Sequence, residues 1–115
     1  MSQVIDRSVL DEMAEMMGGM TEIVDDIVGT YLVETPPLVS TIAGDSTIED
    51  VRIAAHTLKS SSRAVGAMLL GDLAEEIEGA ARDGSLDGVA GARGAVQTSF
   101  DQAAELLGDW QAIPA

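Results

Sequence analysis

Residues 51–66 read VRIAAHTLKSSSRAVG, and apolar or small side chains return in this stretch every three or four positions. That spacing is typical of an α-helix with one buried face. The predicted inward positions are Val51, Ala54, Ala55, Leu58, Ser62 and Val65. Gly66 follows as a natural helix stop, because glycine readily adopts the backbone conformation that ends helices. A helix with such a face must pack against other elements, so the stretch predicts a helical core.

Helical spacing also extends towards the N-terminus. We expect a short helix at about residues 6–17, whose stripe of methionines (Met13, Met16, Met17 and Met20) should be buried. A second helix should start near Thr21. Pro36 and Pro37 should kink or break it, with residues 38–43 adding a turn or two. Ser46 and Glu49 predict a capping box that opens the next helix.

Two further helices are expected towards the C-terminus. The first, at about residues 68–82, should bury Leu70, Leu73, Ile77 and Ala81 and expose Glu75, Glu76 and Glu78. The second, at about residues 88–108, should bury Val89, Val96, Phe100, Ala103 and Leu107. Glycine lowers helix stability, so Gly79, Gly91 and Gly94 predict close contacts between helices.

These elements predict an all-α fold. No strand-like alternation persists for more than a few residues, and 46% of the 115 residues are hydrophobic, enough for one core. We expect one domain over residues 1–115: an antiparallel four-helix bundle with a short extra N-terminal helix.

Charge and composition exclude several classes of function. The chain has 20 acidic and 6 basic residues, a net charge of −14, which disfavours nucleic acid and anionic membranes. It has no cysteine, no signal-like start and no apolar run of the length that crosses a membrane. We therefore expect a cytoplasmic, free-standing monomer whose partners are proteins.

His56 is the only histidine, and it lies among three of the six basic residues. At ~100° per residue, Arg52, Lys59, Ser60 and Arg63 fall within about 60° of His56 around the helix. His56 should point to solvent, because it lies opposite Leu58 and Val65. We expect Lys59 and Arg63 to favour the neutral ring by like-charge repulsion, which keeps a nitrogen lone pair available.

The residues around His56 narrow its chemistry. One histidine without cysteines or carboxylates on its own face offers too few ligands for a metal ion. General-base catalysis would need an orienting carboxylate and a nucleophile, and the spacing supplies neither. Nucleophilic attack needs only an accessible neutral imidazole, so a phosphohistidine fits best.

At this point a resemblance is recognisable. Residues 55–62, AHTLKSSS, followed by Gly66 and Ala67, resemble the signature of histidine-containing phosphotransfer (HPt) domains of two-component phosphorelays. Residues 31–36, YLVETP, and the spacing of Leu70, Leu73, Ile77 and Glu78 look like the helices on either side in that family. Ser60 departs from the family pattern, which usually has glycine there.

The resemblance implies a phosphorelay intermediate without kinase activity of its own. His56 would accept a phosphoryl group from a receiver-domain aspartate, or from a histidine kinase system, and pass it to a response regulator. Lys59 would be the cation beside the phosphoryl group, and Arg52, Ser60, Arg63 and Gly66 would contact phosphate or partner. No cofactor is expected on this chain, since Mg²⁺ would sit on the receiver domain.

Two other functions stay open. An HPt-like bundle could bind and sequester a response regulator without carrying phosphate, although it would not need His56 and Lys59 together. The stretch Asp45-Ser46-Thr47 before a helix is similar to acyl carrier proteins, which carry a pantetheine arm on serine. Against the carrier reading, those proteins have leucine after the serine, and Ser46 is explained as a helix cap.

Overall fold

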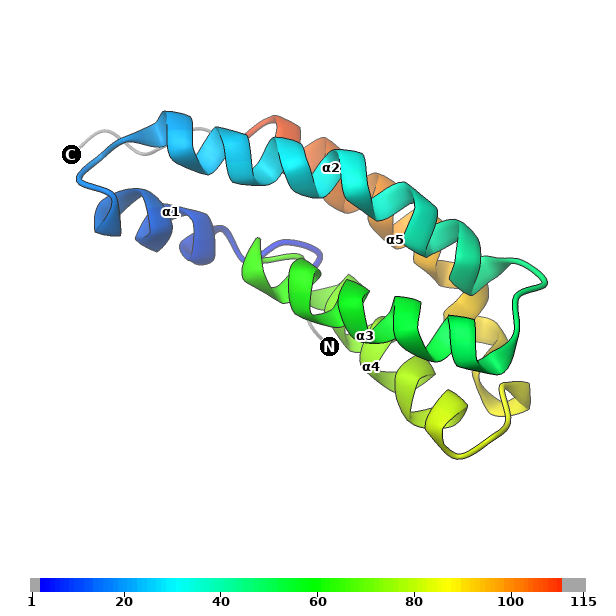
Figure 1. Ribbon diagram of the computed structural model, residues 1–115. Helices are drawn as coiled ribbons and strands as arrows, with labels where there is room; N and C mark the ends of the chain where they lie inside the picture. The colour runs from blue at the N-terminus through cyan, green and yellow to red at the C-terminus, as the bar shows by residue number, and fades with distance from the viewer. Residues whose placement is uncertain (1–2, 111–115) are drawn as a thin grey trace.

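Residues 3–110 are described by a computed structural model, and within them all regular structure is helical. The elements are α1 (Arg7–Met16), α2 (Thr21–Ala43), α3 (Ile48–Ala64), α4 (Met68–Arg82), the 3₁₀-helix η1 (Asp87–Val89) and α5 (Ala90–Gly108). The all-α prediction is confirmed, and the bounds of α4 are the predicted ones (Figure 1).

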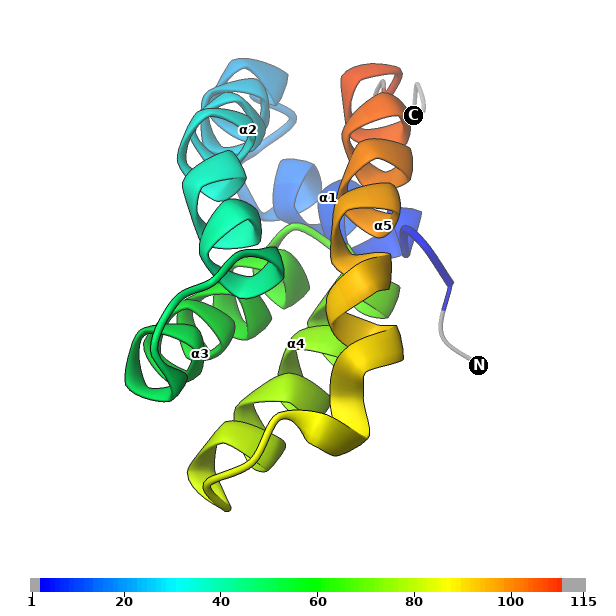
Figure 2. The same cartoon turned by 90° about the vertical axis from the view of Figure 1, so that its right-hand side faces the viewer.

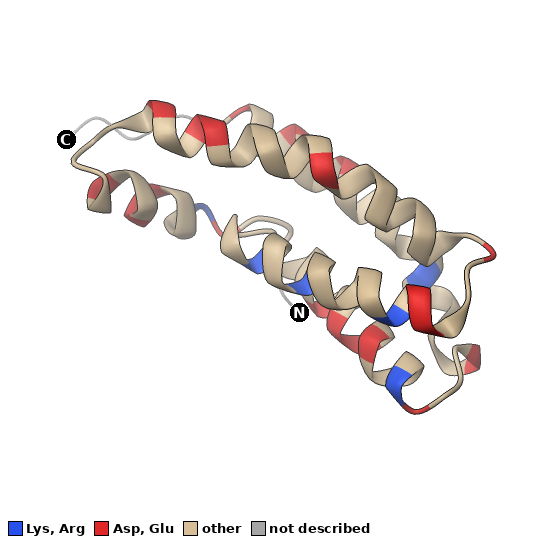
Figure 3. Cartoon of the chain, in the orientation of Figure 1, with Lys and Arg blue, Asp and Glu red and all other residues tan. Residues whose placement is uncertain are grey.

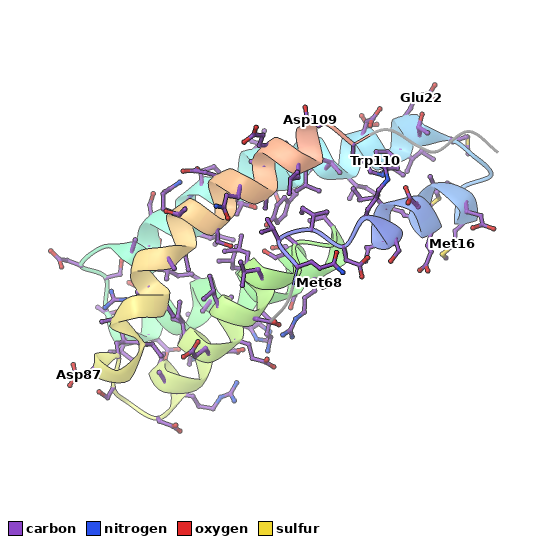
Figure 4. All side chains as sticks on the ribbon, turned by 180° about the vertical axis from the view of Figure 1, so that it is seen from behind. Met16, Glu22, Met68, Asp87, Asp109 and Trp110 are labelled. Carbon is purple, nitrogen blue, oxygen red and sulfur yellow. The ribbon has the colours of Figure 1, made fainter. Side chains whose placement is uncertain are left out.

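Four helices form an antiparallel bundle around one core, with α3 and α4 packed most extensively against each other. Figure 2 shows α2, α3, α4 and α5 at four corners, with α1 across one end. The molecule is elongated, with extents of 48 × 25 × 20 Å. Helix α1 is fastened to the end of α5, because the Trp110 indole donates to Asp11 Oδ1 at 3.0 Å (Figure 4). The bundle with a short extra N-terminal helix is therefore confirmed.

The inner face of α3 holds the predicted residues. Val51, Ala54, Ala55, Leu58, Ser62 and Val65 are all buried. The one hydroxyl among them has a partner, because Ser62 Oγ lies 2.8 Å from the buried Tyr31 hydroxyl of α2. Burial raises the pKa of the Tyr31 phenol. This face turns the opposite side of α3, with His56, towards solvent.

Helix α3 begins differently from the prediction. Thr47, not Ser46, is its N-cap, and Thr47 Oγ1 accepts from the Asp50 backbone N–H at 3.1 Å. The sequence offered two overlapping hydroxyl caps, and the chain uses the later one. The capping-box prediction for Ser46 and Glu49 is therefore wrong. Ser46 is not used as a helix cap, so this no longer argues against a carrier function of Ser46.

Pro36 and Pro37 were expected to kink or break α2, and a break is excluded because the helix runs through both prolines to Ala43, its predicted end. Tyr31 and Thr35 are buried before the two prolines, and Val39 and Ile42 are buried after them. Packing on both sides therefore offsets a cost of about 3 kcal/mol for an interior proline.

Glycine permits a close approach at a different place from the one predicted. A Cβ atom at Gly79, Gly91 or Gly94 would meet nothing within 4 Å, so the predicted contacts there are absent. At Gly71 in α4, by contrast, a Cβ would lie 2.8 Å from Arg63 Cγ. The missing side chain at Gly71 lets Arg63 of α3 lie across α4.

The methionine stripe is only partly inward. Met13 packs against the core, whereas Met16 and Met20 are 83% and 52% exposed at the α1–α2 turn. Leu10 and Ala14 are the buried residues of α1 instead. Within residues 3–110, no helix has the length and apolar character needed to cross a bilayer.

Candidate functional site

His56 projects from the middle of α3 with 61% of its side chain exposed. Its neighbour Ala55 and the following Leu58 are fully buried, so they fix which way the helix faces. The prediction that the ring points outward is confirmed. The ring is nevertheless anchored, because Nδ1 lies 2.6 Å from Oε2 of Glu78 on α4.

Glu78 is the centre of the site, and its side chain is only 3% exposed. Oε1 accepts from Lys59 Nζ at 2.7 Å. Oε2 accepts from Arg82 at 3.2 Å as well as lying against His56. The bond from Lys59 lowers the pKa of Glu78 and outweighs the opposing effect of burial, with a smaller lowering from His56. Glu78 is therefore an ionised, buried carboxylate.

An ionised carboxylate can only accept hydrogen bonds, so His56 Nδ1 must carry the proton that it donates to Glu78. In the neutral ring the lone pair then belongs to Nε2. Nε2 is the ring nitrogen that does not face Glu78, and 61% of the His56 side chain is exposed. The arrangement presents one oriented nucleophilic nitrogen to an incoming group.

The cations of α3 all have carboxylate partners. Lys59 is 22% exposed and pairs with Glu78. Arg52 pairs with Glu49 one turn earlier on α3, which lowers the pKa of Glu49. Arg63 pairs with Asp72 and Glu75 of α4, both at 3.0 Å. Figure 3 shows the basic residues of α3 running beside the acidic residues of α4.

These ion pairs correct the electrostatic expectation. Repulsion by Lys59 and Arg63 was expected to keep the ring neutral. The group in direct contact with the ring is instead the carboxylate of Glu78, and both cations are engaged with carboxylates. In the structure it is therefore Glu78 that orients the His56 ring and leaves Nε2 as the free nitrogen.

Ser60 and Gly66 take different positions around the site. Ser60 is exposed, and its hydroxyl donates back to the His56 carbonyl at 3.3 Å, so it adds little bulk above the helix. Gly66 does not lie on the His56 face. It is buried in the α3–α4 turn with φ of 85°, and its carbonyl accepts from Asp6 N–H at 2.7 Å. The predicted contact of Gly66 with phosphate or partner is replaced by a structural role.

The sequence patterns do not identify two residues of the site, Glu78 and Arg82. Glu78 was predicted to be exposed, yet it is buried, and Arg82 was not considered. One signal could have placed Glu78: it shares a helical stripe with Ala74 and Ala81, both small and buried. Its partners on α3 are 19 and 22 residues away, and spacing within one helix cannot show such contacts. Among residues 3–110 there is no group of three side chains suited to hold a metal ion.

The chain is similar to known proteins both in sequence and in fold. A family model described as "Hpt domain" matches residues 7–106, which include every residue of the site. The crystal structure of histidine-containing phosphotransfer protein B (HptB) from Pseudomonas aeruginosa PAO1 superposes with a TM-score of 0.79. The match covers 94% of each chain at 23% identity, so it shows a shared fold. No curated protein matches the chain.

Proposed function

The chain belongs to the Hpt domain family, and from that premise we propose that it is a phosphorelay intermediate working through His56. It accepts a phosphoryl group from a receiver-domain aspartate, or from a histidine kinase system, and passes the group to a response regulator. Family membership supports a relay role in general, and the geometry around His56 supports the choice of residue.

The observation that carries the proposal is the exposed ring whose Nδ1 lies 2.6 Å from buried Glu78. The Nε2 lone pair attacks the phosphorus of the aspartyl phosphate. The bond from phosphorus to the aspartate oxygen breaks, and its electron pair leaves with the carboxylate. Nδ1 keeps its proton throughout, so the phosphorylated ring is cationic and Glu78 stabilises it across the hydrogen bond. Onward transfer runs the same steps in reverse.

Lys59 supplies positive charge beside the phosphoryl group. An ammonium has three donors, and the bond to Glu78 Oε1 uses one of them. The other two donors can begin to bind phosphoryl oxygens on Nε2, and the charge of the phosphoryl group then draws the ammonium from Glu78 towards it. Arg52, Ser60 and Arg63 flank this position along α3 and would meet the receiver domain.

The partner supplies the rest of the chemistry. The Mg²⁺ ion and the acyl phosphate belong to the receiver domain, and a sensor histidine kinase is the ultimate donor. This chain contributes a positioned nucleophile and a docking face, as a cytoplasmic monomeric carrier and not a kinase. It is expected to use no nucleotide, since it has no glycine-rich phosphate loop.

The test is transfer of labelled phosphate from a phosphorylated receiver domain to wild type and to His56→Gln. Wild type should take up acid-labile label, and His56→Gln should take up none. Acid-stable label, or label that persists in His56→Gln, would exclude His56 as the acceptor. Unchanged receiver binding by His56→Gln, with no uptake by wild type, would instead support a sequestering module. Intact mass after incubation with a pantetheine transferase tests the carrier reading of Ser46.

Lys59→Ala gives a second arm of the same assay. Loss of one cation beside the phosphoryl group should slow transfer about tenfold to 150-fold, given roughly 1.5–3 kcal/mol for a hydrogen bond to a charged group. Helix content should not change. Transfer at the wild-type rate would remove Lys59 from the site.

A further inference from the structure

Arg82 is a basic residue of the site that the transfer chemistry above does not use. It lies in the last turn of α4, one turn after Glu78, and its guanidinium Nη2 is 3.2 Å from Glu78 Oε2. The same oxygen faces His56 Nδ1 at 2.6 Å. Arg82 and His56 therefore share one carboxylate oxygen, while Lys59 has the other.

Three donors thus define the orientation of the Glu78 carboxylate. His56 and Lys59 approach it from α3, and Arg82 approaches it along α4. Arg82 is the only donor of the three that lies on the same helix as Glu78, so its contact does not depend on where α3 side chains move. The carboxylate in turn fixes the His56 ring, because Nδ1 can donate to it in one ring orientation.

Once His56 is phosphorylated, the phosphoryl group and Glu78 would compete for the Lys59 ammonium. A phosphoryl group carries between one and two negative charges and attracts an adjacent ammonium. If Lys59 turns towards it, Glu78 loses the bond to Oε1 that contributes most to its low pKa. A buried carboxylate without a cation is costly, so the site needs a second counterion. Arg82, which is 65% exposed, already occupies that position.

A purely structural role for Arg82 is the competing explanation. A cation in the last turn favours the helix dipole, and an exposed i,i+4 ion pair contributes about 0.3–0.5 kcal/mol. That role predicts a small effect on α4 and none on the His56 ring. The two explanations therefore differ in what happens at His56.

We propose that Arg82 is a positioning residue, which holds the Glu78 carboxylate against His56 Nδ1 and keeps it paired when the phosphoryl group draws Lys59 away. The proposal rests on the proposed function for its second part only. Its first part concerns the unphosphorylated protein, so the two can fail separately.

The experiment uses the single histidine as a spectroscopic probe. Protein labelled with ¹⁵N at histidine gives one pair of ring nitrogen shifts, which report the tautomer of His56 directly. We compare wild type with Arg82→Gln and Arg82→Lys, each in the Lys59 and the Lys59→Ala background. Arg7→Gln is the matched control, since Arg7 forms an i,i+4 pair with Asp11 in α1, next to the segment that contacts the start of α4, whereas Arg82 lies in its last turn.

Arg82→Gln should shift the neutral ring towards the form with the proton on Nε2, raising that population about twofold to fivefold. The change should be larger in the Lys59→Ala background, where Glu78 has no other cation, and Arg82→Lys should restore most of it. Transfer from a phosphorylated receiver should slow by a similar factor in Arg82→Gln. Arg7→Gln should leave both measurements at wild-type values.

Unchanged ring nitrogen shifts for Arg82→Gln in both backgrounds would overturn the proposal, even if α4 is less stable. Altered shifts with unchanged transfer rates would overturn its second part and leave Arg82 as an orienting group only. Since the shifts are measured without phosphate, they stay decisive if His56 proves not to be the acceptor.

Discussion

The imidazole of His56 is held at one nitrogen and open at the other, and a single buried carboxylate accounts for both. Glu78 lies 2.6 Å from Nδ1 and 2.7 Å from Lys59 Nζ. At this scale the site is a charge cluster, in which the carboxylate orients the His56 ring and binds Lys59 beside it. Removing the charge of Glu78 while keeping its shape should therefore disturb both.

Glu78→Gln should lower the free energy of unfolding at pH 7 by about 1–3 kcal/mol, because Lys59 and Arg82 lose a charged acceptor. The pKa of Glu78 is lowered in the folded protein from its ordinary value of 4.5. Its ionised form therefore stabilises the fold above pH 4.5, and this contribution is lost as the pH falls through the lower, folded-state pKa. Urea unfolding of wild type and Glu78→Gln at pH 7, 5, 4 and 3 should show that the difference between their free energies of unfolding becomes smaller as the pH falls.

If this difference in free energy of unfolding stays constant from pH 7 to pH 3, the ionised carboxylate is not its source. Glu76→Gln is the matched control, since Glu76 is an exposed glutamate on the same helix. It should leave the free energy of unfolding nearly unchanged at every pH.

Much of the site is predictable at the scale of single residues, and the part that is not predictable has a physical cause. The outward direction of His56 follows from the burial of Ala55 and Leu58 on the same helix. The stripe that Glu78 shares with Ala74 and Ala81 indicates its burial, but its partners on α3 depend on how α4 rotates against α3. Arg52 and Arg63 are predicted on the His56 face, and their carboxylate partners lie on a neighbouring turn of α3 or on α4.

At the scale of elements, helix α3 and its C-terminal turn set the position of the site. Gly66 ends the helix with φ of 85°, and a Cβ there would lie 2.6 Å from the Asp6 carbonyl oxygen. The turn thus joins α3, α4 and the segment before α1. Helix types and most bounds were predictable from periodicity, whereas the cap at Thr47 and the uninterrupted α2 depended on packing and local competition between hydroxyls.

Gly66→Ala should be the more damaging of two comparable glycine substitutions. Gly84 also has a positive φ, 91°, but a Cβ there would meet nothing within 4 Å. Gly84→Ala should cost about 1 kcal/mol for backbone strain alone, and Gly66→Ala about 2 kcal/mol more for the collision with Asp6. Thermal and urea unfolding of the two variants measure the difference. Equal losses would show that the contact with Asp6 does not constrain the turn.

At the scale of the whole molecule, α2 and α3 pack against each other along one side of an elongated bundle. A groove between these helices is lined by Leu38, Thr41, Ser46, Asp50, Ile53 and Ala54. Ile53 lies one turn before His56 and is 51% exposed, although most large apolar residues are buried. A receiver that reaches His56 would cover this side chain.

Ile53→Ser should weaken binding of the receiver domain about fivefold to 150-fold, because one lost apolar contact costs about 1–3 kcal/mol. Leu106→Ser is the matched control, because Leu106 is similarly exposed, at 48%, but lies on α5. Calorimetric titration of each variant with the receiver measures the affinities. Equal weakening by both substitutions would contradict docking beside His56.

The role proposed for Glu78 is to hold Nδ1 so that the phosphoryl group forms its bond with Nε2. It is tested most directly by phosphorylating histidine-¹⁵N protein with a charged receiver and recording the phosphorus–nitrogen coupling by NMR. One-bond coupling of phosphorus to Nε2 is expected, with the proton retained on Nδ1. Coupling to Nδ1, or a phosphorus signal uncoupled from the ring, would contradict it.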